Sequence, residues 1–315
     1  MTSASCLVLG GAGFIGRALV EKLARDGWRV RVLDRVAPAK PTAGVDYRIG
    51  SSDDEPVLRD ALGKADVCFH LVSTTLPASS NKMILYDLDT NLRNSVRLME
   101  TCVELGVKKL VYLSSGGTVY GVGAGSKTSE DTPLRPICAY GVTKSSVELY
   151  LGLFRHLHGL DYRVARLSNP YGPGQSAQGA QGAVAVFMDK IAKGEVVEIW
   201  GDGSVVRDFV YIDDVISAIV ELGENFSQKT ERSVFNVGSG LGVSLRELIR
   251  LIETAVGLKA NIRFQPPRGV DVPLNILDCA AIHQAIGWRA TTSIELGLKL
   301  TWDVYCQDRQ GRSSH

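Results

Sequence analysis

Near its start the chain reads Cys6-Leu7-Val8-Leu9-Gly10-Gly11-Ala12-Gly13-Phe14-Ile15-Gly16. The apolar run predicts a short buried strand, and the glycines at the first, fourth and seventh places of the turn predict that it opens a helix. Because glycine has no Cβ, the backbone can approach a pyrophosphate closely, and the helix N-terminus offers free N–H groups to the anion. The stretch predicts a dinucleotide-binding turn, although a glycine-rich turn standing alone is often only a turn.

An acidic residue follows at the position that such a turn requires. Asp34 ends the next predicted strand, about 20 residues further on. Its carboxylate could accept hydrogen bonds from both hydroxyls of an adenosine ribose and would repel a 2′-phosphate, which favours NAD over NADP. Arg35 beside it weakens that preference, and the alternative is that Asp34 is only a surface charge at a strand end.

Strands and helices alternate through the first half of the chain. The strands are almost wholly apolar, which is typical of a parallel sheet covered on both faces. We therefore expect an α/β fold, a Rossmann-type doubly wound parallel sheet with a smaller, mostly C-terminal substrate-binding lobe. The predicted strands are Cys6–Leu9, Arg29–Leu33, Val67–Val72, Lys109–Leu113 and Tyr162–Leu167, and the predicted helices are Phe14–Arg25, Glu55–Leu62, Asn91–Leu105 and Ala139–His156.

The pattern changes after the fifth strand, where a loop rich in Gly, Pro, Ser and Gln begins. We expect an NAD-binding domain over residues 1–168, to which the chain returns at about 205–240, and a smaller substrate-binding lobe from residues 169–204 and 241–315. Within the second half, Asp213 is expected to cap a helix, and Ser244 with Glu247 forms a capping-box pattern at the start of another.

Composition narrows the class of protein. The chain has 315 residues, 45% of them hydrophobic and 22% charged, with 35 Lys+Arg against 34 Asp+Glu. This is ordinary for a folded enzyme, and without a basic excess we expect no nucleic-acid partner and no polybasic membrane anchor. No apolar run approaches the roughly 20 residues of a membrane helix, and no signal-peptide pattern is present. The six cysteines are scattered, without the spacing of a metal site. We therefore expect a cytoplasmic protein without a bound metal.

Tyr140-Gly141-Val142-Thr143-Lys144 is the second stretch with chemical meaning. A spacing of four on a helix puts the phenol and the ammonium on one face. A nearby cation favours the phenolate, which would make Tyr140 a usable base. The alternative is an amphipathic helix with a buried tyrosine and a solvated lysine. The motif lies in a helix after the fourth predicted strand of a dinucleotide domain, and this context favours the chemical interpretation.

Together these motifs resemble the extended short-chain dehydrogenase/reductase family, and within it the NAD-dependent nucleotide-sugar (UDP-hexose) 4-epimerases and the 4,6-dehydratases. The resemblance runs through nearly the whole chain. Beyond the glycine turn and the Tyr140/Lys144 pair it rests on Phe69-His70-Leu71, Asn91, Ser114–Gly121, Arg166–Gly174, Trp200–Gly203, Arg207–Asp214, Phe235–Gly238 and Pro267–Pro273.

The resemblance implies a role for each matching residue. Tyr140 would be the base, and Lys144 would hold the nicotinamide ribose and lower the pKa of Tyr140. The NAD site would be lined by Gly10, Gly13, Phe14, Ile15, Gly16, Asp34, Arg35, Leu71, Asn91 and Ser114. Asn169 and Arg207 would contact the diphosphate of a UDP-sugar, Arg268 and Asp271 would hold the uridine end, and Asn275 would face the C2 substituent of the sugar.

Without the family resemblance, two of these assignments would be replaced by structural roles. Arg207-Asp208 would be a structural ion pair, and Asn275 would only cap a local turn.

The chain departs from the family pattern at three places. The strand-end Asp that meets adenine falls on Ser51, so Asp53 is a guess as its substitute. The catalytic Ser or Thr falls on Gly116, which leaves Thr118, Ser115 or Tyr140 alone to do its work. The Asp-Glu pair of the 4,6-dehydratases falls on Gly117 and Thr118, which cannot supply an acid and a base for elimination.

We therefore expect an NAD-dependent C4 epimerase of a UDP-hexose or a UDP-N-acetylhexosamine. The alternatives are a reductase or 4,6-dehydratase of the same family, or an NAD-binding sensor that has lost turnover. Relatives commonly pair through the two long helices predicted at 91–105 and 139–156, so a homodimer is expected.

Overall fold

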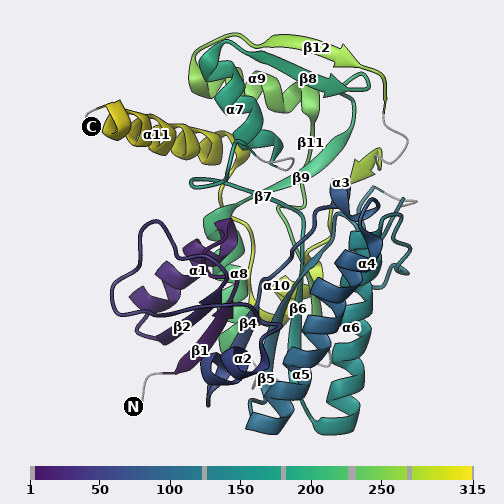
Figure 1. Cartoon of the computed structure of the whole chain (residues 1–315). Helices are drawn as coiled ribbons and strands as arrows, with labels where there is room; N and C mark the ends of the chain where they lie inside the picture. Colours follow the sequence, from purple (N-terminus) through teal and green to yellow (C-terminus); the bar gives the residue numbers. More distant parts are fainter. Residues whose placement is uncertain (1–3, 123–125, 179–181, 226–231, 268–271, 314–315) are drawn as a thin grey trace.

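The computed structural model describes residues 4–122, 126–178, 182–225, 232–267 and 272–313 (Figure 1). Its centre is a seven-stranded parallel sheet, which confirms the predicted fold class. In spatial order the strands are β10 (Val234–Val237), β6 (Asp161–Leu167), β5 (Lys109–Ser115), β4 (Val67–His70), β1 (Ser5–Leu9), β2 (Arg29–Asp34) and β3 (Asp46–Ile49).

Helices cover both faces of this sheet because side chains alternate along each strand. Val8 and Val32 point to one face, where they pack with α1 (Phe14–Arg25) and α8 (Ile212–Glu224). Leu7 and Leu33 point to the other face. There the covering helices are α2 (Glu55–Leu62), α5 (Asn94–Leu105) and α6 (Ala139–His158) (Figure 1).

The strand order reverses between β1 and β4, since the chain adds β2 and β3 on one side of β1 and β4, β5 and β6 on the other. In open parallel sheets ligands bind at the carboxyl ends of the strands beside such a reversal. This edge of the sheet carries the turns that follow β1, β4 and β5, so the topology alone points to these turns as the site.

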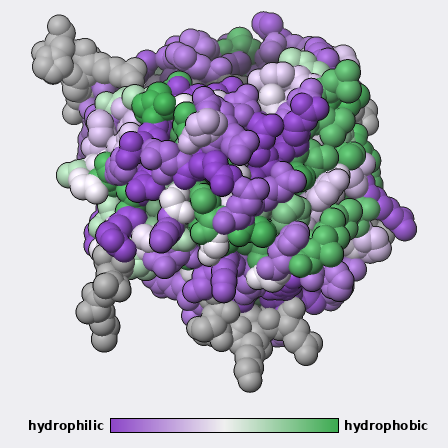
Figure 2. Space-filling model, turned by 60° about the horizontal axis from the view of Figure 1, so that its bottom comes forward, coloured by the Kyte–Doolittle hydropathy of each residue, from purple (hydrophilic) through white to green (hydrophobic). Residues whose placement is uncertain are grey.

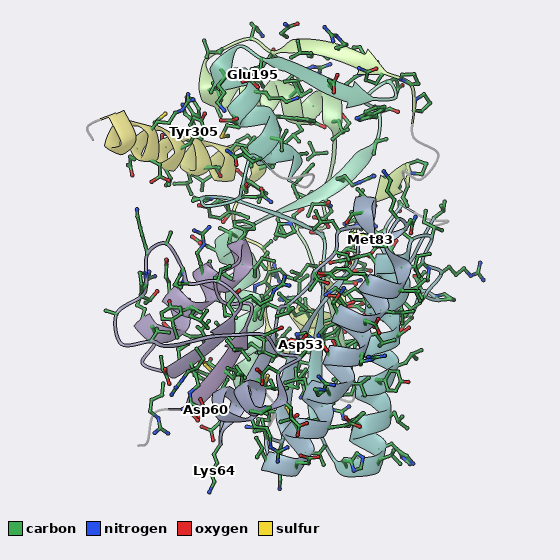
Figure 3. All side chains as sticks on the ribbon, viewed as in Figure 1. Asp53, Asp60, Lys64, Met83, Glu195 and Tyr305 are labelled. Carbon is green, nitrogen blue, oxygen red and sulfur yellow. The ribbon has the colours of Figure 1, made fainter. Side chains whose placement is uncertain are left out.

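A smaller lobe lies beyond this edge, at the top of Figure 1. Its sheets are formed by β11 (Gly242–Ser244), β9 (Val206–Tyr211), β13 (Leu274–Asn275) and β7 (Asn169–Tyr171), and by β12 (Asn261–Gln265) with β8 (Val196–Trp200). Its helices are α7 (Ala183–Lys193), α9 (Leu245–Val256) and α11 (Ile294–Ser313). Tyr305 of α11 (Figure 3) donates a hydrogen bond of 2.8 Å to Asp189 of α7, which ties these two helices together.

The predicted domain limits stay a prediction, but two placements bear on them. β9 lies at the start of the predicted return to the first domain, and it joins the smaller lobe's sheet. α10 (Ala280–Ile286) falls in the predicted sugar lobe, and it contacts β10 of the central sheet. One apolar cluster runs without a break from the sheet to α7 and α9, so the two parts share a core.

The structure differs from the predicted elements at several points, and β7 lies within the stretch that was expected to be a loop. β3 was not expected because it is only four residues long and mostly exposed. The helix expected from Asn91 starts at Asn94, after a π-helical segment, η1 (Leu88–Arg93). Asp213 is not a cap: Tyr211 takes the N-cap position of α8 and Asp213 lies in the first turn, where the helix dipole favours an acidic residue.

The Ser244 cap is confirmed, since its hydroxyl accepts the Glu247 N–H at 3.2 Å. None of the helices in the described part of the chain combines the length and the hydrophobicity that crossing a bilayer requires.

Candidate functional site

The glycine turn after β1 has the shape that its sequence predicts. Gly10 has φ +86°, in the left-handed region that favours glycine. A Cβ on Gly16 would lie 2.0 Å from the carbonyl oxygen of Gly10, so no other residue fits there. Gly13, at the N-cap of α1, has no side chain that could occupy the first N–H groups of the helix. The turn therefore presents open backbone donors to an anion, as a dinucleotide pyrophosphate requires.

Asp34 braces this turn. Its Oδ2 accepts the N–H of Ala12 at 2.9 Å, and its Oδ1 accepts the N–H of Val36 at 3.3 Å. The side chain is half-buried at the end of β2, so Asp34 is more than a surface charge. Each carboxylate oxygen can accept a second hydrogen bond, which leaves capacity for ribose hydroxyls.

The other residues predicted to bind the cofactor are placed unequally. Phe14 and Ile15 are half-buried in the first turn of α1, and Leu71 donates its N–H to Leu9 O at 3.0 Å, directly beside the glycine turn. Arg35 is exposed next to Asp34. Asp53 (Figure 3) lies before α2 with an exposed side chain, and the contact described for it is Arg97 donating to its backbone carbonyl at 2.6 Å.

Tyr140 and Lys144 lie on one face of α6, as predicted. The Nζ atom of Lys144 is 5.5 Å from the centroid of the Tyr140 ring and donates to the carbonyl of Leu113, at the end of β5, over 2.9 Å. Lys144 is 5% exposed, so the alternative of a solvated lysine is wrong. Ser73, in the loop after β4, acts on the Tyr140 hydroxyl and favours its ionised form.

The pKa of Tyr140 does not follow the expectation from the residues. Burial, with smaller contributions from Cys138 and Asp87, raises the pKa of Tyr140 to about 12, and Ser73 opposes this only in part. Burial also lowers the pKa of Lys144 to about 8, although Asp87 and Glu148 oppose that shift. Among the chain's own groups desolvation therefore outweighs the attraction of the lysine, and Tyr140 is a neutral phenol at neutral pH.

Asn91 is buried at the site but its amide is already engaged. Its Oδ1 accepts the N–H of Thr74 at 2.9 Å, and its Nδ2 donates to Asp87 at 3.0 Å. Sequence reasoning missed Asp87, which lies in a stretch without a motif. The one available signal was its spacing of four from Asn91, which places both side chains on one helical face.

Ser114 is buried at the end of β5, and its hydroxyl donates to Glu148 at 2.5 Å. Glu148 also receives the guanidinium of Arg166, with both side chains buried. Paired and hydrogen-bonded in this way, the two buried charges are mutually compensated. The Ser114 hydroxyl thus serves a structural network at the rear of the site.

Two residues further along, the position of the usual Ser or Thr is shaped by a distant side chain. A Cβ on Gly116 would lie 2.6 Å from Cδ1 of Leu277, which is fully buried, so Leu277 takes the space of a side chain there. The Oγ1 atom of Thr118 is enclosed and has no hydrogen-bond partner among the described residues. A buried hydroxyl without a partner is costly, so the Thr118 hydroxyl is available to a bound ligand.

Three of the residues predicted to bind substrate lie on one sheet of the smaller lobe: Asn169 on β7, Arg207 on β9 and Asn275 on β13. Asn169 donates its amide to Asp208 O at 2.9 Å, across from β7 to β9. Asn275 is 4% exposed, donates to the carbonyl of Gly116 at 3.1 Å, and has an Oδ1 atom without a partner in the described structure. Arg268 and Asp271 lie outside the described residues.

Arg207 and Asp208 do not form the ion pair that the residues alone suggest. Neighbours on a strand point to opposite faces, so the two side chains separate. Arg207 donates to the carbonyls of Val206 and Val272, at 3.0 and 2.6 Å. The buried Asp208 carboxylate instead accepts from the N–H and hydroxyl of Ser239 and from the N–H groups of Gly240 and Leu277.

Within the described ranges, no group of three or more His, Cys, Asp and Glu side chains is placed to hold a metal ion. The chemistry available to the site comes from hydroxyl, amide, ammonium and guanidinium groups and from the dinucleotide that the glycine turn fits.

Comparison with known proteins places this site in a family. A sequence model described as the NAD dependent epimerase/dehydratase family matches residues 6–238. The chain is 35% identical over 309 residues to UDP-glucose 4-epimerase of Mycolicibacterium smegmatis, covering 95% of this chain and 97% of that protein. It is 31% identical over 315 residues to dTDP-4-dehydro-6-deoxyglucose reductase of Escherichia coli, covering 96% and 98%.

Among solved structures, the fold matches UDP-glucose 4-epimerase of the hyperthermophilic eubacterium Thermotoga maritima, solved with UDP-glucose. The TM-score is 0.91 at 36% identity, over 97% of this chain and 99% of the other. These matches confirm the resemblance read from the sequence motifs and the expected cofactor, NAD. The chain belongs to the NAD dependent epimerase/dehydratase family.

Proposed function

We propose that the protein interconverts the C4 epimers of a UDP-hexose or UDP-N-acetylhexosamine through a 4-keto intermediate. The observation that carries this proposal is the unpartnered Thr118 hydroxyl, which stands on the same edge of the sheet as Tyr140 and the glycine turn. A hydroxyl donor, a phenol and a dinucleotide turn at one edge are the groups that a reversible oxidation of a sugar carbinol requires.

The protein's own residues would divide the work as follows. Tyr140 takes the proton of the sugar 4-hydroxyl as C4 is oxidised, and returns it when C4 is reduced. Lys144 fixes the position of Tyr140 and of the nicotinamide ribose, and Thr118 donates to the developing sugar oxyanion. The glycine turn and Lys144 would hold NAD, which would supply a reversible hydride acceptor for C4 and a positive ring that favours the Tyr140 phenolate.

The same residues argue against elimination of water, and the cofactor requirement distinguishes a reductase. Elimination of water needs an acid and a base beside C5 and C6. Gly117 and Thr118 occupy the positions where the dehydratases carry them, and neither can ionise near neutral pH. A reductase consumes a reduced nicotinamide in every turnover, whereas an epimerase restores its NAD, so the requirement for added cofactor separates these two.

The proposal is tested by the products. Purified protein is incubated with UDP-glucose, UDP-galactose, UDP-GlcNAc and UDP-GalNAc, without added cofactor, and followed by NMR and mass spectrometry. We expect inversion at C4 at unchanged mass. A product that has lost one water, or turnover only with added NADH or NADPH, would assign a different reaction.

Tyr140→Phe tests the base. It removes one hydroxyl and should keep the fold and the bound NAD while lowering turnover by about 10²–10⁴-fold, as loss of a general base does. NAD released on denaturation serves as the control for an intact site. Near-normal turnover of this variant would contradict the mechanism.

We propose Asn275 as the residue that admits an N-acetyl group at C2. Its buried, unpartnered Oδ1 atom is an acceptor suited to an amide N–H. Asn275→Tyr should abolish turnover of the N-acetylated pair and spare UDP-galactose. An equal decline of both pairs would show that Asn275 only supports the Gly116 carbonyl to which it donates.

We also propose that the protein is a homodimer that pairs through α5 and α6. Leu149, Leu153 and Leu157 repeat at helical spacing on the outer side of α6 and are 72%, 45% and 59% exposed. Figure 2 shows apolar surface gathered on its right-hand side, the side on which Figure 1 draws α6. An apolar stripe on an outer helix face is typical of an interaction surface.

Sedimentation tests this assembly. Leu153→Glu should convert the dimer to a monomer, while Leu258→Glu, at an apolar residue that is also half exposed but lies after α9, should leave it unchanged. A wild-type protein that sediments as a monomer would refute the proposed dimer.

A further inference from the structure

Asp87 is a fully buried carboxylate with no assigned role. It ends α4 (Ile84–Asp87), immediately before the π-helical segment η1, and is 0% exposed. A carboxylate in such a place is strongly destabilising unless donors surround it. Three side chains supply them: Thr75 and Asn91 donate to Oδ1, and Thr143 donates to Oδ2. All three direct hydrogen-bond donors to Asp87 are neutral, and the Lys144 ammonium acts on it electrostatically without a described ion pair.

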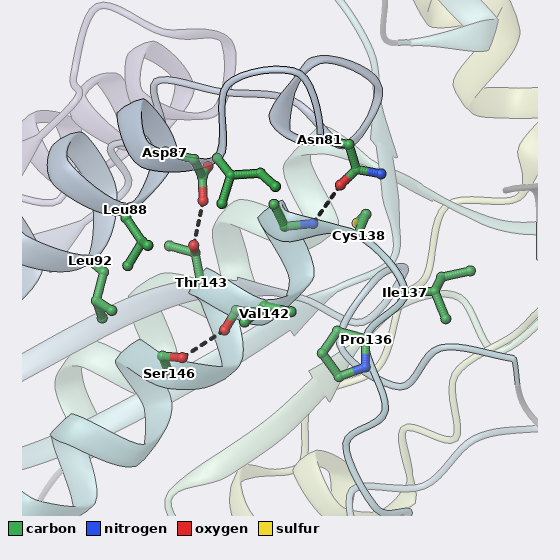
Figure 4. Close-up of a pocket in the computed structure, with 12 residues that line it drawn as sticks. Asn81, Asp87, Leu88, Leu92, Pro136, Ile137, Cys138, Val142, Thr143 and Ser146 are labelled. Carbon is green, nitrogen blue, oxygen red and sulfur yellow. Dashed lines mark hydrogen bonds between the residues drawn. The ribbon is translucent and has the colours of Figure 1, made fainter.

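The three donors belong to the segments that hold Tyr140. Thr143 lies on α6 between Tyr140 and Lys144, and its bond to Asp87 is drawn in Figure 4. Asn91 connects Asp87 to the loop after β4, because its Oδ1 atom accepts the N–H of Thr74. The neighbouring Ser73 acts on the Tyr140 hydroxyl and favours its ionised form, and its own hydroxyl donates to Thr75 O at 3.2 Å.

The segment before Asp87 also fixes the beginning of α6. Ser80 Oγ accepts the N–H of Tyr140 at 3.0 Å, and Asn81 Oδ1 accepts the N–H of Ala139 at 2.8 Å (Figure 4). The segment of α3 (Pro77–Ser80) and α4 thus holds the first turn of α6 in place. Asp87, at the end of this segment, connects it to the loop after β4. A π-helical segment such as η1 is frequently found at functional sites.

We propose that Asp87 is a positioning residue of the reaction: its carboxylate joins Thr143 of α6 to the Ser73–Thr75 loop, and so holds the Tyr140 hydroxyl between Ser73 and Lys144 while placing a negative charge beside them. This inference rests on the proposed role of Tyr140. It assigns Asp87 no contact with sugar or cofactor.

The charge of Asp87 acts on both members of the pair in the same direction. It raises the pKa of Tyr140 and it raises the pKa of Lys144. Removing the charge should therefore lower both values. The other titratable groups that act on the pair stay in place in such a variant, and they are Cys138 and Glu148 of α6 and its cap, His70 of β4 and Tyr112 of β5.

Asp87→Asn tests the inference, because it keeps the shape of the side chain and removes the charge. We expect kcat to fall at least tenfold with KM little changed, and both limbs of the pH profile of kcat to move to lower pH. Asp89→Asn is the matched control, two residues away with an exposed carboxylate paired to Arg93 at 3.1 Å, and should leave kcat and the profile unchanged.

A second pair of variants covers the case in which Asp87→Asn fails to fold. Thr143→Val breaks the link to α6 and leaves Asp87 in place, so kcat should fall, whereas Thr143→Ser keeps the hydroxyl and should restore it. A purely structural role would lower the melting temperature and leave the pH profile in place. Wild-type kcat with an unmoved profile in Asp87→Asn, or equal activity of Thr143→Val and Thr143→Ser, would overturn the inference.

These outcomes are separate from the failure of the proposed function. If Tyr140→Phe retains activity, the assignment of the base is wrong. The Asp87 and Thr143 variants are read only against a wild-type enzyme in which Tyr140→Phe is inactive.

Discussion

Two glycine-containing turns lie at the same edge of the sheet, and a different steric obstacle excludes a side chain from each. At Gly16 the obstacle is local, since a Cβ would lie 2.0 Å from the carbonyl oxygen of Gly10, six residues earlier. At Gly116 the obstacle is Leu277, which comes from the smaller lobe and would lie 2.6 Å from a Cβ. The first glycine is required by its own turn, and the second by a residue far away in the chain.

The two turns therefore differ in the substitutions that they can accommodate. The obstacle at Gly16 is backbone, which cannot move without unmaking the turn. The obstacle at Gly116 is the end of a side chain, which a second substitution can remove. Gly16 is therefore a fixed requirement of the dinucleotide-binding turn. At position 116, by contrast, two combinations are sterically compatible: glycine with Leu277, or a larger residue with a smaller side chain at position 277.

The largest effect should come from Gly16→Ala. Overlap with backbone atoms has no cheap relief, and we expect a loss of about 4 kcal/mol or more in the free energy of unfolding, with loss of bound NAD. Gly13→Ala is the control, because its Cβ would meet only Gly10 O at an ordinary 3.4 Å, and it should fold. Urea denaturation measures both, and equal stabilities would remove the basis of the comparison.

Gly116→Ser and Leu277→Ala form a double-mutant cycle that tests the distant obstacle. Each change alone should destabilise, the first by overpacking and the second by leaving a cavity. Together they should be less harmful than the sum by about 2 kcal/mol, because the new side chain fills the space that Leu277 vacates. Additive values from urea denaturation would mean that Leu277 does not exclude a side chain at Gly116.

Sequence patterns predicted the local part of this site well. The glycine turn, the strand that precedes it and the face shared by Tyr140 and Lys144 depend on spacing within a few residues, and the structure has them as expected. The direction of the Tyr140 pKa shift was not predictable, because it depends on how deeply the folded chain buries the phenol.

The roles of Asp87 and Leu277 were hidden for the same reason. Each acts across the fold, through Thr143 in one case and against Gly116 in the other. The ion pair expected for Arg207 and Asp208 shows the opposite error, since adjacency in the sequence puts side chains on opposite faces of a strand. Local geometry can be predicted from one sequence, and pairings between distant segments cannot.

A smaller effect should follow Thr118→Ala. Leu277 leaves no room for a side-chain hydroxyl at position 116. If Thr118 supplies that hydroxyl instead, its loss should lower kcat about tenfold, near 1.4 kcal/mol, with KM little changed. Thr118→Ser should keep the activity. Should Ser115→Ala lower kcat while Thr118→Ala does not, the donor is Ser115.

The smallest effect concerns His70, whose behaviour is also set by burial. Burial, with Lys144 nearby, lowers the pKa of His70 to about 3, so the folded protein keeps the ring neutral while the unfolded chain takes up a proton below a pKa of about 6.5. Stability is therefore complete above that pH and declines as the pH falls. At pH 6 the loss should be about 1 kcal/mol.

His70→Gln should remove this part of the acid sensitivity. Urea denaturation at pH 8 and at pH 6 should show a decline in the wild type that is about 1 kcal/mol larger than in the variant. The same decline in both proteins would mean that the ring becomes charged in the folded state.

The central claim, that hydride leaves C4 of the sugar and returns to the same carbon, is tested most directly with UDP-glucose carrying deuterium at C4. Purified protein without added cofactor should yield UDP-galactose that retains the deuterium at C4 at unchanged mass, as followed by NMR and mass spectrometry. Loss of the deuterium to solvent, its transfer to added cofactor, or a dehydrated product would contradict the account.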